Sequence, residues 1–358
     1  MSHRPTLAIL ALVLSFAAAA CGGGTDATAE SPASEEATAA ADGLVVVTTT
    51  NILADLTARL VGDHGTVTAL MPVGADPHSF QLSSAQGQQL RDADIVVANG
   101  LGLEEGMLDA LESAADEGVE VVSLAETVTT LAEDQTEDEG HAEEEEHGEE
   151  NHAEEEDHAE EEDHGEEEDH AEEGHEHDHA DGDPHFWMDP VRVAEAIEDL
   201  ALHLAEVDDN ATEAEWAARA EVLVAELQAL DEEVEEILSV VADDRRVLVT
   251  NHDSYDYFAD AYEFEVLGTV IPGGGTLAEP SAADLEILVE DIRDAGVTAI
   301  FTETTDPSRL AEVVAQEVGE EIAVVQLVGG SLTDADGPAA TYADYMRHNA
   351  TLIADALG

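Results

Sequence analysis

Residues 44–60 read Leu-Val-Val-Val-Thr-Thr-Thr-Asn-Ile-Leu-Ala-Asp-Leu-Thr-Ala-Arg-Leu, and within them a strand pattern passes directly into a helix pattern. The β-branched run from Leu44 to Thr50 predicts a buried strand. Asn51 is expected to cap a helix with one apolar face. The residues of that face are Ile52, Leu53, Leu56 and Leu60. A strand that leads at once into an amphipathic helix begins a βαβ unit, so this stretch predicts a parallel sheet.

The same alternation recurs in two blocks of the chain. In the first block, further strands are expected at 67–71, 95–98 and 119–124, with helices at 83–91 and 103–115. In the second block, strands are expected at 247–250, 266–271, 297–301 and 322–327. Helices are expected between and after them at 254–262, 281–295, 307–318 and 341–357. We therefore predict an α/β protein with two four-stranded parallel-sheet lobes.

Two helices are predicted between the blocks, at 190–206 and at 211–242. In the second, apolar residues recur at alternating intervals of four and three: Leu223, Leu227, Leu230, Val234, Ile237 and Val241. A helix of about 30 residues is roughly 45 Å long and can bridge two lobes as a strut. The expected division is an N-terminal lobe at 44–210, a linking helix at 211–242 and a C-terminal lobe at 243–358.

The charge of the chain is extreme, with 86 acidic residues, 10 basic residues and a net charge of −76. Such a charge argues against nucleic acid and anionic membrane surfaces as partners. Because the acidity extends over the whole chain, it fits a salty habitat as well as a functional role. The single cysteine, Cys21, excludes an internal disulfide and a cysteine-rich zinc site, so histidines and carboxylates would have to bind any zinc.

The N-terminus resembles an export signal. Arg4 precedes an apolar run from Leu7 to Ala20, which is too short for a membrane span and suits a signal peptide. Ala18, Ala19 and Ala20 lead directly to Cys21, as in a bacterial lipoprotein signal, so residues 1–20 are expected to be removed and Cys21 lipidated. Ordinary secretion with a nearby cleavage site is the alternative. The composition of residues 21–43 predicts a flexible tether.

Four candidate metal ligands follow predicted strands or precede a predicted helix. His78 follows the second strand, His252 follows the first strand of the second block, and Asp334 follows the last strand; His185 stands before the helix at 190. Ligands of open parallel sheets bind beyond the carboxyl ends of the strands, so these residues can converge between the lobes. Three imidazoles and a carboxylate form a closed tetrahedral zinc shell, which predicts binding and not hydrolysis.

Neighbouring acidic residues allow several interpretations. Asp76 and Asp183 can orient histidine rings, although Asp-Pro is also a common turn. Asp189 is well placed to cap a helix that begins with Pro190. Glu303 ends a predicted strand and either faces the cleft or belongs to the approach to the next helix.

Seven ordered stretches carry a resemblance to a known family. They are 48–55, 73–80, 98–104, 183–190, 252–258, 279–281 and 341–349, including Val-Gly-Ala-Asp-Pro-His-Ser-Phe and Asp-Pro-His-Phe-Trp-Met-Asp-Pro. Together they span about 44–131 and 184–358. The chain resembles the substrate-binding proteins of bacterial zinc and manganese ABC importers, the ZnuA/TroA-like family of cluster A-I.

The resemblance implies two lobes, a long bridging helix and a metal site in the interlobe cleft. It carries ligand roles onto His78, His185, His252 and Asp334, with water or another carboxylate as the alternative to Asp334. Zinc-preferring members have a histidine where this chain has His252, whereas manganese-preferring members have a carboxylate. The implied function is extracytoplasmic capture of Zn²⁺ as cargo by a lipid-anchored or periplasmic monomer, which delivers it to ABC permease membrane subunits and is not an enzyme.

The segment at 133–183 consists almost entirely of Glu, Asp, His, Ala and Gly, with 29 acidic residues and no basic one. Such a composition cannot form a core and predicts disorder. Its nine histidines are His141, His147, His152, His158, His164, His170, His175, His177 and His179. A low-affinity metal-binding loop and a merely solvating insert are both compatible with this pattern. The resemblance favours the first interpretation, because many zinc-type members carry such a loop.

Three rival functions remain at this stage. The same fold can carry Mn²⁺ or Fe²⁺, which His252 argues against. A zinc hydrolase would need an open coordination position, and none of the predicted helices carries a His-Glu-x-x-His motif. A metal-buffering surface adhesin, acting in cell adhesion without a permease, is compatible with the sequence.

Overall fold

The structure is a computed structural model that describes residues 43–131, 182–305, 309–319 and 322–358. The predictions for the signal peptide at 1–20, for Cys21 and for the nine insert histidines lie outside these residues. So do the tether at 21–43 and the insert at 133–183, apart from Gly43, Gly182 and Asp183.

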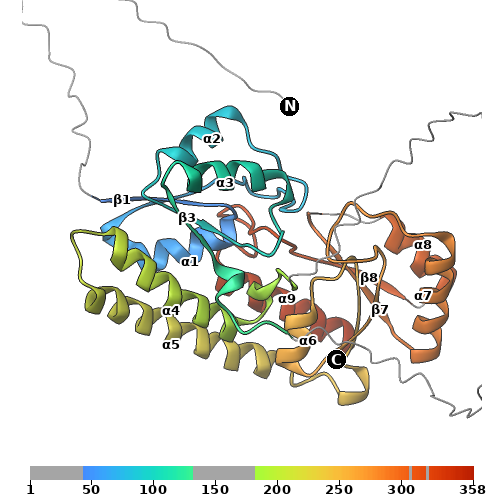
Figure 1. The fold of residues 1–358 in the computed structure, drawn as a ribbon. Helices are drawn as coiled ribbons and strands as arrows, with labels where there is room; N and C mark the ends of the chain where they lie inside the picture. The colour runs from blue at the N-terminus through green and yellow to red at the C-terminus, as the bar shows by residue number, and fades with distance from the viewer. Residues whose placement is uncertain (1–42, 132–181, 306–308, 320–321) are drawn as a thin grey trace, which may run out of the picture. The chain divides into compact units, whose positions relative to one another are not determined.

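The first lobe is built on a parallel sheet with the strand order β2-β1-β3-β4. Its strands are β1 (Leu44–Thr48), β2 (Gly65–Ala69), β3 (Ile95–Ala98) and β4 (Glu120–Ser123). Its helices are α1 (Asn51–Val61), α2 (Ser84–Arg91) and α3 (Leu108–Asp116). Figure 1 shows α2 and α3 on one side of this sheet and α1 on the other. The expected parallel sheet is therefore confirmed.

The cap of α1 differs from the prediction by one residue. The side chain of Thr50, not Asn51, accepts the hydrogen bond from the backbone N–H of Leu53. The Asn51 amide instead donates to the hydroxyl of Ser331 and accepts from the backbone N–H of Leu332, both at 2.8 Å. Thr50 caps the helix, and the Asn51 side chain bonds a loop 280 residues away. Sequence spacing alone does not reveal this distant contact.

Two long helices form a hairpin along the molecule (Figure 1). Asp189 caps α4 (Pro190–Val207), as expected, by accepting from the backbone N–H of Val191 at 2.7 Å. The α5 helix (Glu213–Leu238) begins with a capping box between Thr212 and Glu215. Its 26 residues span about 39 Å, which is shorter than expected. Val241, which was expected on the apolar face of this helix, is buried in the segment beyond the helix end.

The second lobe contains four parallel strands in two hydrogen-bonded pairs, β5-β6 and β7-β8. The strands are β5 (Val247–Thr250), β6 (Glu265–Thr269), β7 (Ala299–Glu303) and β8 (Ala323–Leu327). The helices are α6 (Asp256–Tyr262), α7 (Ala282–Ala295), α8 (Arg309–Val318) and α9 (Tyr342–Leu357).

One continuous four-stranded sheet was expected in this lobe and is not formed among the described residues. Strands β5 and β7 lie next to each other but are not joined by a hydrogen-bonded ladder. The β5–β6 pairing is also irregular, because its register shifts between Leu248 and Val249, where Leu267 of β6 has no opposite residue.

A shared hydrophobic core joins the two lobes. It includes Leu56 of α1, Leu200 of α4, Leu230 of α5, Phe258 of α6 and Ile353 of α9, all buried. Each lobe has a smaller core of its own against its sheet. The C-terminal helix α9 packs on α5 and so attaches the second lobe to this long helix. Both lobes are therefore held on one apolar spine of α4, α5 and α9.

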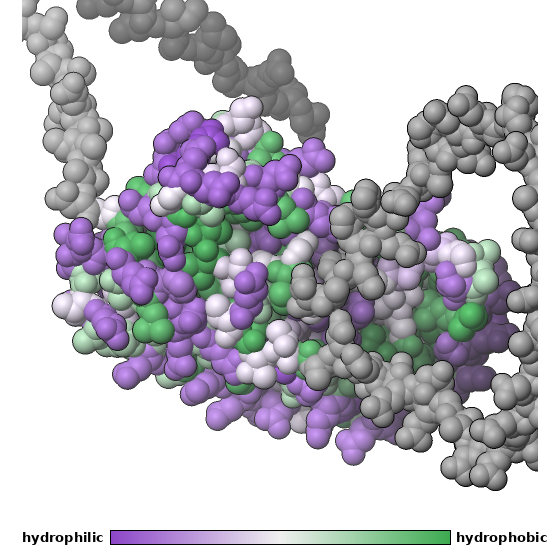
Figure 2. All heavy atoms as spheres, viewed as in Figure 1, coloured by the Kyte–Doolittle hydropathy of each residue, from purple (hydrophilic) through white to green (hydrophobic). Residues whose placement is uncertain are grey.

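The outer surface of this spine is polar. Figure 2 shows mainly hydrophilic residues along the lower edge of the view, over α5. Within the described parts of the chain, no helix combines the length and apolar character needed to cross a membrane.

The two faces of α5 should respond differently to truncation. Leu227 is 1% exposed, whereas Val222 on the same helix is 62% exposed. Leu227→Ala should lower the free energy of unfolding by about 2–5 kcal/mol, because it leaves a cavity in the core. Val222→Ala should change it by less than about 0.5 kcal/mol. Urea denaturation of both metal-free variants measures the difference, and similar midpoints would contradict the assigned helix face.

Candidate metal centre

Three buried histidine side chains converge in one cavity. His78 lies in the loop after β2, His185 immediately before the turn at Phe186–Met188, and His252 in the loop after β5. Each is at most 3% exposed. Their ring centroids are 5.3–5.4 Å apart, and one nitrogen from each ring lies within 4.8 Å of the other two. The site therefore combines two ligand candidates from the first lobe with one from the second.

The spacing of the ring nitrogens fits a bound metal. Two nitrogens at about 2.05 Å from a tetrahedral zinc would be roughly 3.3 Å apart. The Nε2 atoms of His78 and His185 are 3.2 Å apart. Two nitrogen lone pairs repel at this distance, so the arrangement needs a proton or a metal cation between them.

A carboxylate fixes the orientation of His185. Oδ1 of Asp183 lies 2.7 Å from the His185 Nδ1 and accepts from its backbone N–H at 2.9 Å. Because an ionised carboxylate only accepts hydrogen bonds, Nδ1 carries the ring proton and Nε2 presents its lone pair to the cavity. This matches the orienting role expected for Asp183. Asp76 accepts from the backbone N–H of His78 and from the hydroxyls of Ser79 and Thr276.

Glu303 is the carboxylate that the second lobe brings to the site. It ends β7, is 5% exposed, and its Oε2 lies 3.8 Å from the His252 Nδ1. The hydroxyl of Ser254 donates to its other oxygen at 3.2 Å. The missing side chain of Gly329 makes room for it, because a Cβ atom there would lie 2.7 Å from Oε2. Of the two interpretations left open for Glu303, the structure supports the one that faces the cleft.

The expectation that Asp334 joins the three histidines is wrong for this structure. Asp334 is exposed, and its backbone carbonyl accepts from the N–H of Gly337 at 2.7 Å in a surface turn. The loop after β8 meets the cavity earlier, at Gly330, and has turned away before residue 334. An exposed turn keeps the Asp334 carboxylate in water, so the buried acid beside the rings is Glu303.

The cavity has the size of an ion. Its volume is about 10 Å³, roughly the space of one water-sized sphere. Besides the three rings, the lining includes Trp187, Glu303, Thr305 and Gly330. A bare cation fits this space, whereas an organic substrate does not.

The surroundings of the rings are strongly acidic. Burial alone would favour the neutral ring of His185, but the charge and hydrogen bond of Asp183, with Glu303 and Asp253, raise its pKa. Burial and the nearby charges of Asp253 and Asp183 raise the pKa of Asp256 to about 7. The sequence reasoning did not single out Asp253 and Asp256, although both follow His252 closely in the chain. The negative charge of the carboxylates beside the rings favours a cation in the site.

Fold and site together define a two-lobed solute-binding protein whose cargo is a metal ion. A family model described as zinc-uptake complex component A, periplasmic, matches residues 46–356. The chain therefore belongs to the family of zinc-uptake complex component A. It is a metal-binding solute-binding protein of ABC import and not an enzyme.

Individual relatives differ in the metal that they are named for. The chain is 37% identical to the high-affinity zinc uptake system protein ZnuA of Paracoccus denitrificans, over 86% of this chain and 90% of that protein. It is 27% identical to the manganese-binding lipoprotein MntA of Halalkalibacterium halodurans, over 94% and 93%. The solved structure of the periplasmic zinc-binding protein TroA from Treponema pallidum superposes with a TM-score of 0.69 and 26% identity. That match covers 88% of this chain and 99% of TroA.

Asp256 should make the metal-free protein less stable as pH rises. A carboxyl whose pKa is higher when folded binds its proton more tightly in the folded state, so stability falls between about pH 4 and pH 7. Asp256→Asn should therefore raise the unfolding free energy at pH 8 by about 1 kcal/mol, a value discounted for partial exposure, with the difference shrinking toward pH 4. Urea denaturation at both pH values checks this. Asp291→Asn, exposed on α7, is the control, and equal effects of the two changes would contradict the raised pKa.

Proposed function

We propose that this protein captures Zn²⁺ outside the cytoplasmic membrane and delivers it to an ABC permease. The observation that carries the proposal is the convergence of three buried imidazoles, His78, His185 and His252, on one ion-sized cavity. Imidazole nitrogen suits zinc, whereas manganese prefers a site with more oxygen ligands. Because relatives are named for both metals, the donor set is the basis for choosing zinc.

The fourth coordination position is assigned to Glu303 or to a water molecule that it holds. The carboxylate is buried and lies on the His252 side of the cavity. A site with three protein nitrogens and one oxygen completes the tetrahedral shell that zinc adopts in proteins. Asp334 has no part in this shell.

Location and partners follow from the family. The family description is periplasmic, and several relatives are named lipoproteins. We infer that Cys21 carries the lipid anchor and that the metal-loaded protein docks on the membrane subunits of its importer as a monomer. The nine histidines of the insert are proposed to bind metal weakly and to raise its local concentration.

Metal competition tests the cargo and the ligand set. Protein lacking residues 1–42 should bind one zinc ion tightly, and excess Mn²⁺ should not displace it. His252→Ala should weaken zinc binding by about 100-fold or more, because even loss of a group that only orients a ligand costs roughly 10- to 100-fold. Asp334→Ala is the matched control and should bind like the wild type in calorimetric titration. Tight Mn²⁺ binding would overturn the choice of cargo, and a weakened Asp334→Ala would overturn the ligand set.

Deletion of residues 135–180 separates the insert from the principal site. The shortened protein should keep the tight zinc site and lose only weak binding, because His78, His185 and His252 lie outside the deleted segment. Zinc titration of both forms measures the number of ions in each class. Loss of the tight site with the insert would show that the insert histidines, and not the three buried rings, form the principal site.

A further inference from the structure

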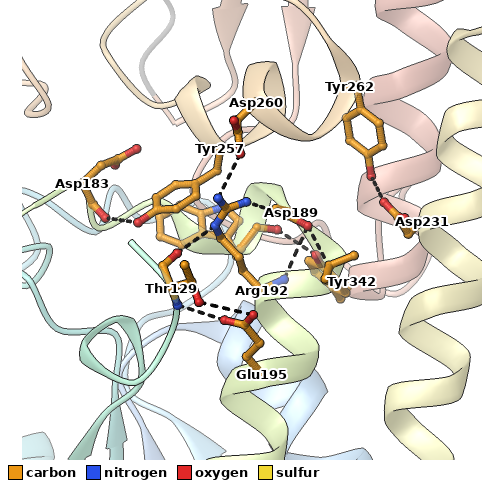
Figure 3. Close-up of polar contacts among 12 residues, drawn as sticks. Thr129, Asp183, Asp189, Arg192, Glu195, Asp231, Tyr257, Asp260, Tyr262 and Tyr342 are labelled. Carbon is orange, nitrogen blue, oxygen red and sulfur yellow. Dashed lines mark hydrogen bonds and ion pairs between the residues drawn. The ribbon is translucent and has the colours of Figure 1, made fainter. Parts of the chain in front are cut away.

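Helix α6 of the second lobe contacts the segment that carries His185. Tyr257, the second residue of α6, is fully buried, and its hydroxyl donates to the backbone carbonyl of Asp183 at 3.1 Å. Figure 3 shows this contact next to the entry of α4. This hydroxyl therefore links α6 to the backbone two residues before His185.

Arg192 of α4 holds the Tyr257 ring in place. Its guanidinium carbon lies 4.9 Å from the centre of that ring. The same side chain donates to the carbonyl of Thr129 and to the carboxylate of Asp260, both at 2.9 Å, and pairs with Asp189 (Figure 3). The guanidinium thus lies over the face of the Tyr257 ring and links the first lobe to α6.

The contact reaches the metal centre through a single residue. Asp183 accepts from Tyr257 through its backbone and from the His185 ring through its side chain. On the first-lobe side, the amide of Asn99 donates to the carbonyl of the intervening Pro184 at 2.8 Å. Residues 183–185 therefore accept hydrogen bonds from both lobes. The Tyr257 hydroxyl donates the one from the second lobe.

We propose that Tyr257 is a positioning residue for metal retention: through Asp183 it keeps the His185 ring aimed at the cargo, and its loss speeds metal release. This inference rests on the proposed function, because it takes His185 as a ligand. Removal of the hydroxyl frees the Asp183 carbonyl, so the carboxylate and the ring that it orients gain freedom. The expected effect is the loss of about one net hydrogen bond, a roughly 3- to 10-fold faster release.

Helix α6 itself supplies a matched control. Tyr262 is also buried on α6, and its hydroxyl donates to Oδ1 of Asp231 on α5 at 3.0 Å. Figure 3 shows that this pair stands apart from Asp183. Tyr262→Phe removes one hydroxyl and one hydrogen bond from the same helix without touching the segment that carries His185.

The test is stopped-flow release of zinc from the loaded protein into a chelator. Wild type, Tyr257→Phe and Tyr262→Phe are compared, and urea denaturation of the metal-free forms monitors stability. Both variants should lose similar stability, and only Tyr257→Phe should release zinc faster. Equal release rates in the two variants would overturn the positioning role.

A double-mutant cycle tests the route through Asp183. In an Asp183→Asn background, Tyr257→Phe should accelerate release by much less, because the carboxylate that transmits the effect is gone. An undiminished effect would overturn the route. A wild type that holds no zinc tightly would overturn the proposed function itself, whereas a tight wild-type complex with unchanged Tyr257→Phe release overturns the positioning role alone.

Discussion

The rest of this structure depends on the burial of three imidazole rings around one small cavity. Each ring leaves water on folding, and a buried polar nitrogen is costly unless it finds a partner. The chain meets this cost in two ways. Asp183 from the first lobe and Glu303 from the second stand beside the rings of His185 and His252, and the lone pairs that remain converge so that one cation can satisfy them together.

Such a site requires the two lobes to keep a fixed position relative to each other, and the packing between them fixes that position. The spine of α4, α5 and α9 shares one core with both lobes. Polar contacts between distant segments add to it: Asn51 bonds the loop at Ser331, and the hydroxyl of Tyr342 donates to the carbonyl of Trp187 at 2.7 Å. Because Trp187 lies two residues from His185, the C-terminal helix is anchored close to the metal centre.

Much of this arrangement could be predicted from the sequence, because it depends on local pattern. The strand–helix alternation and the three histidines beside it are properties of short windows, and β3 and β5 begin and end where expected. The predictions that were wrong concern the path of loops and the pairing of strands that are distant in the sequence. Asp334 follows β8, but its loop has already turned away from the cavity, whereas Glu303 reaches it directly from the end of β7.

The size of the cavity also bears on which ions can enter at all. Room for about one water-sized sphere means that a cation must shed its hydration shell before it is enclosed. Mg²⁺ gives up its waters reluctantly, and Ca²⁺ needs six to eight oxygen ligands, which three imidazole rings do not supply. These two ions would therefore lose their waters without gaining the oxygen ligands that they prefer, whereas three imidazole nitrogens compensate a transition metal such as zinc for the waters that it sheds.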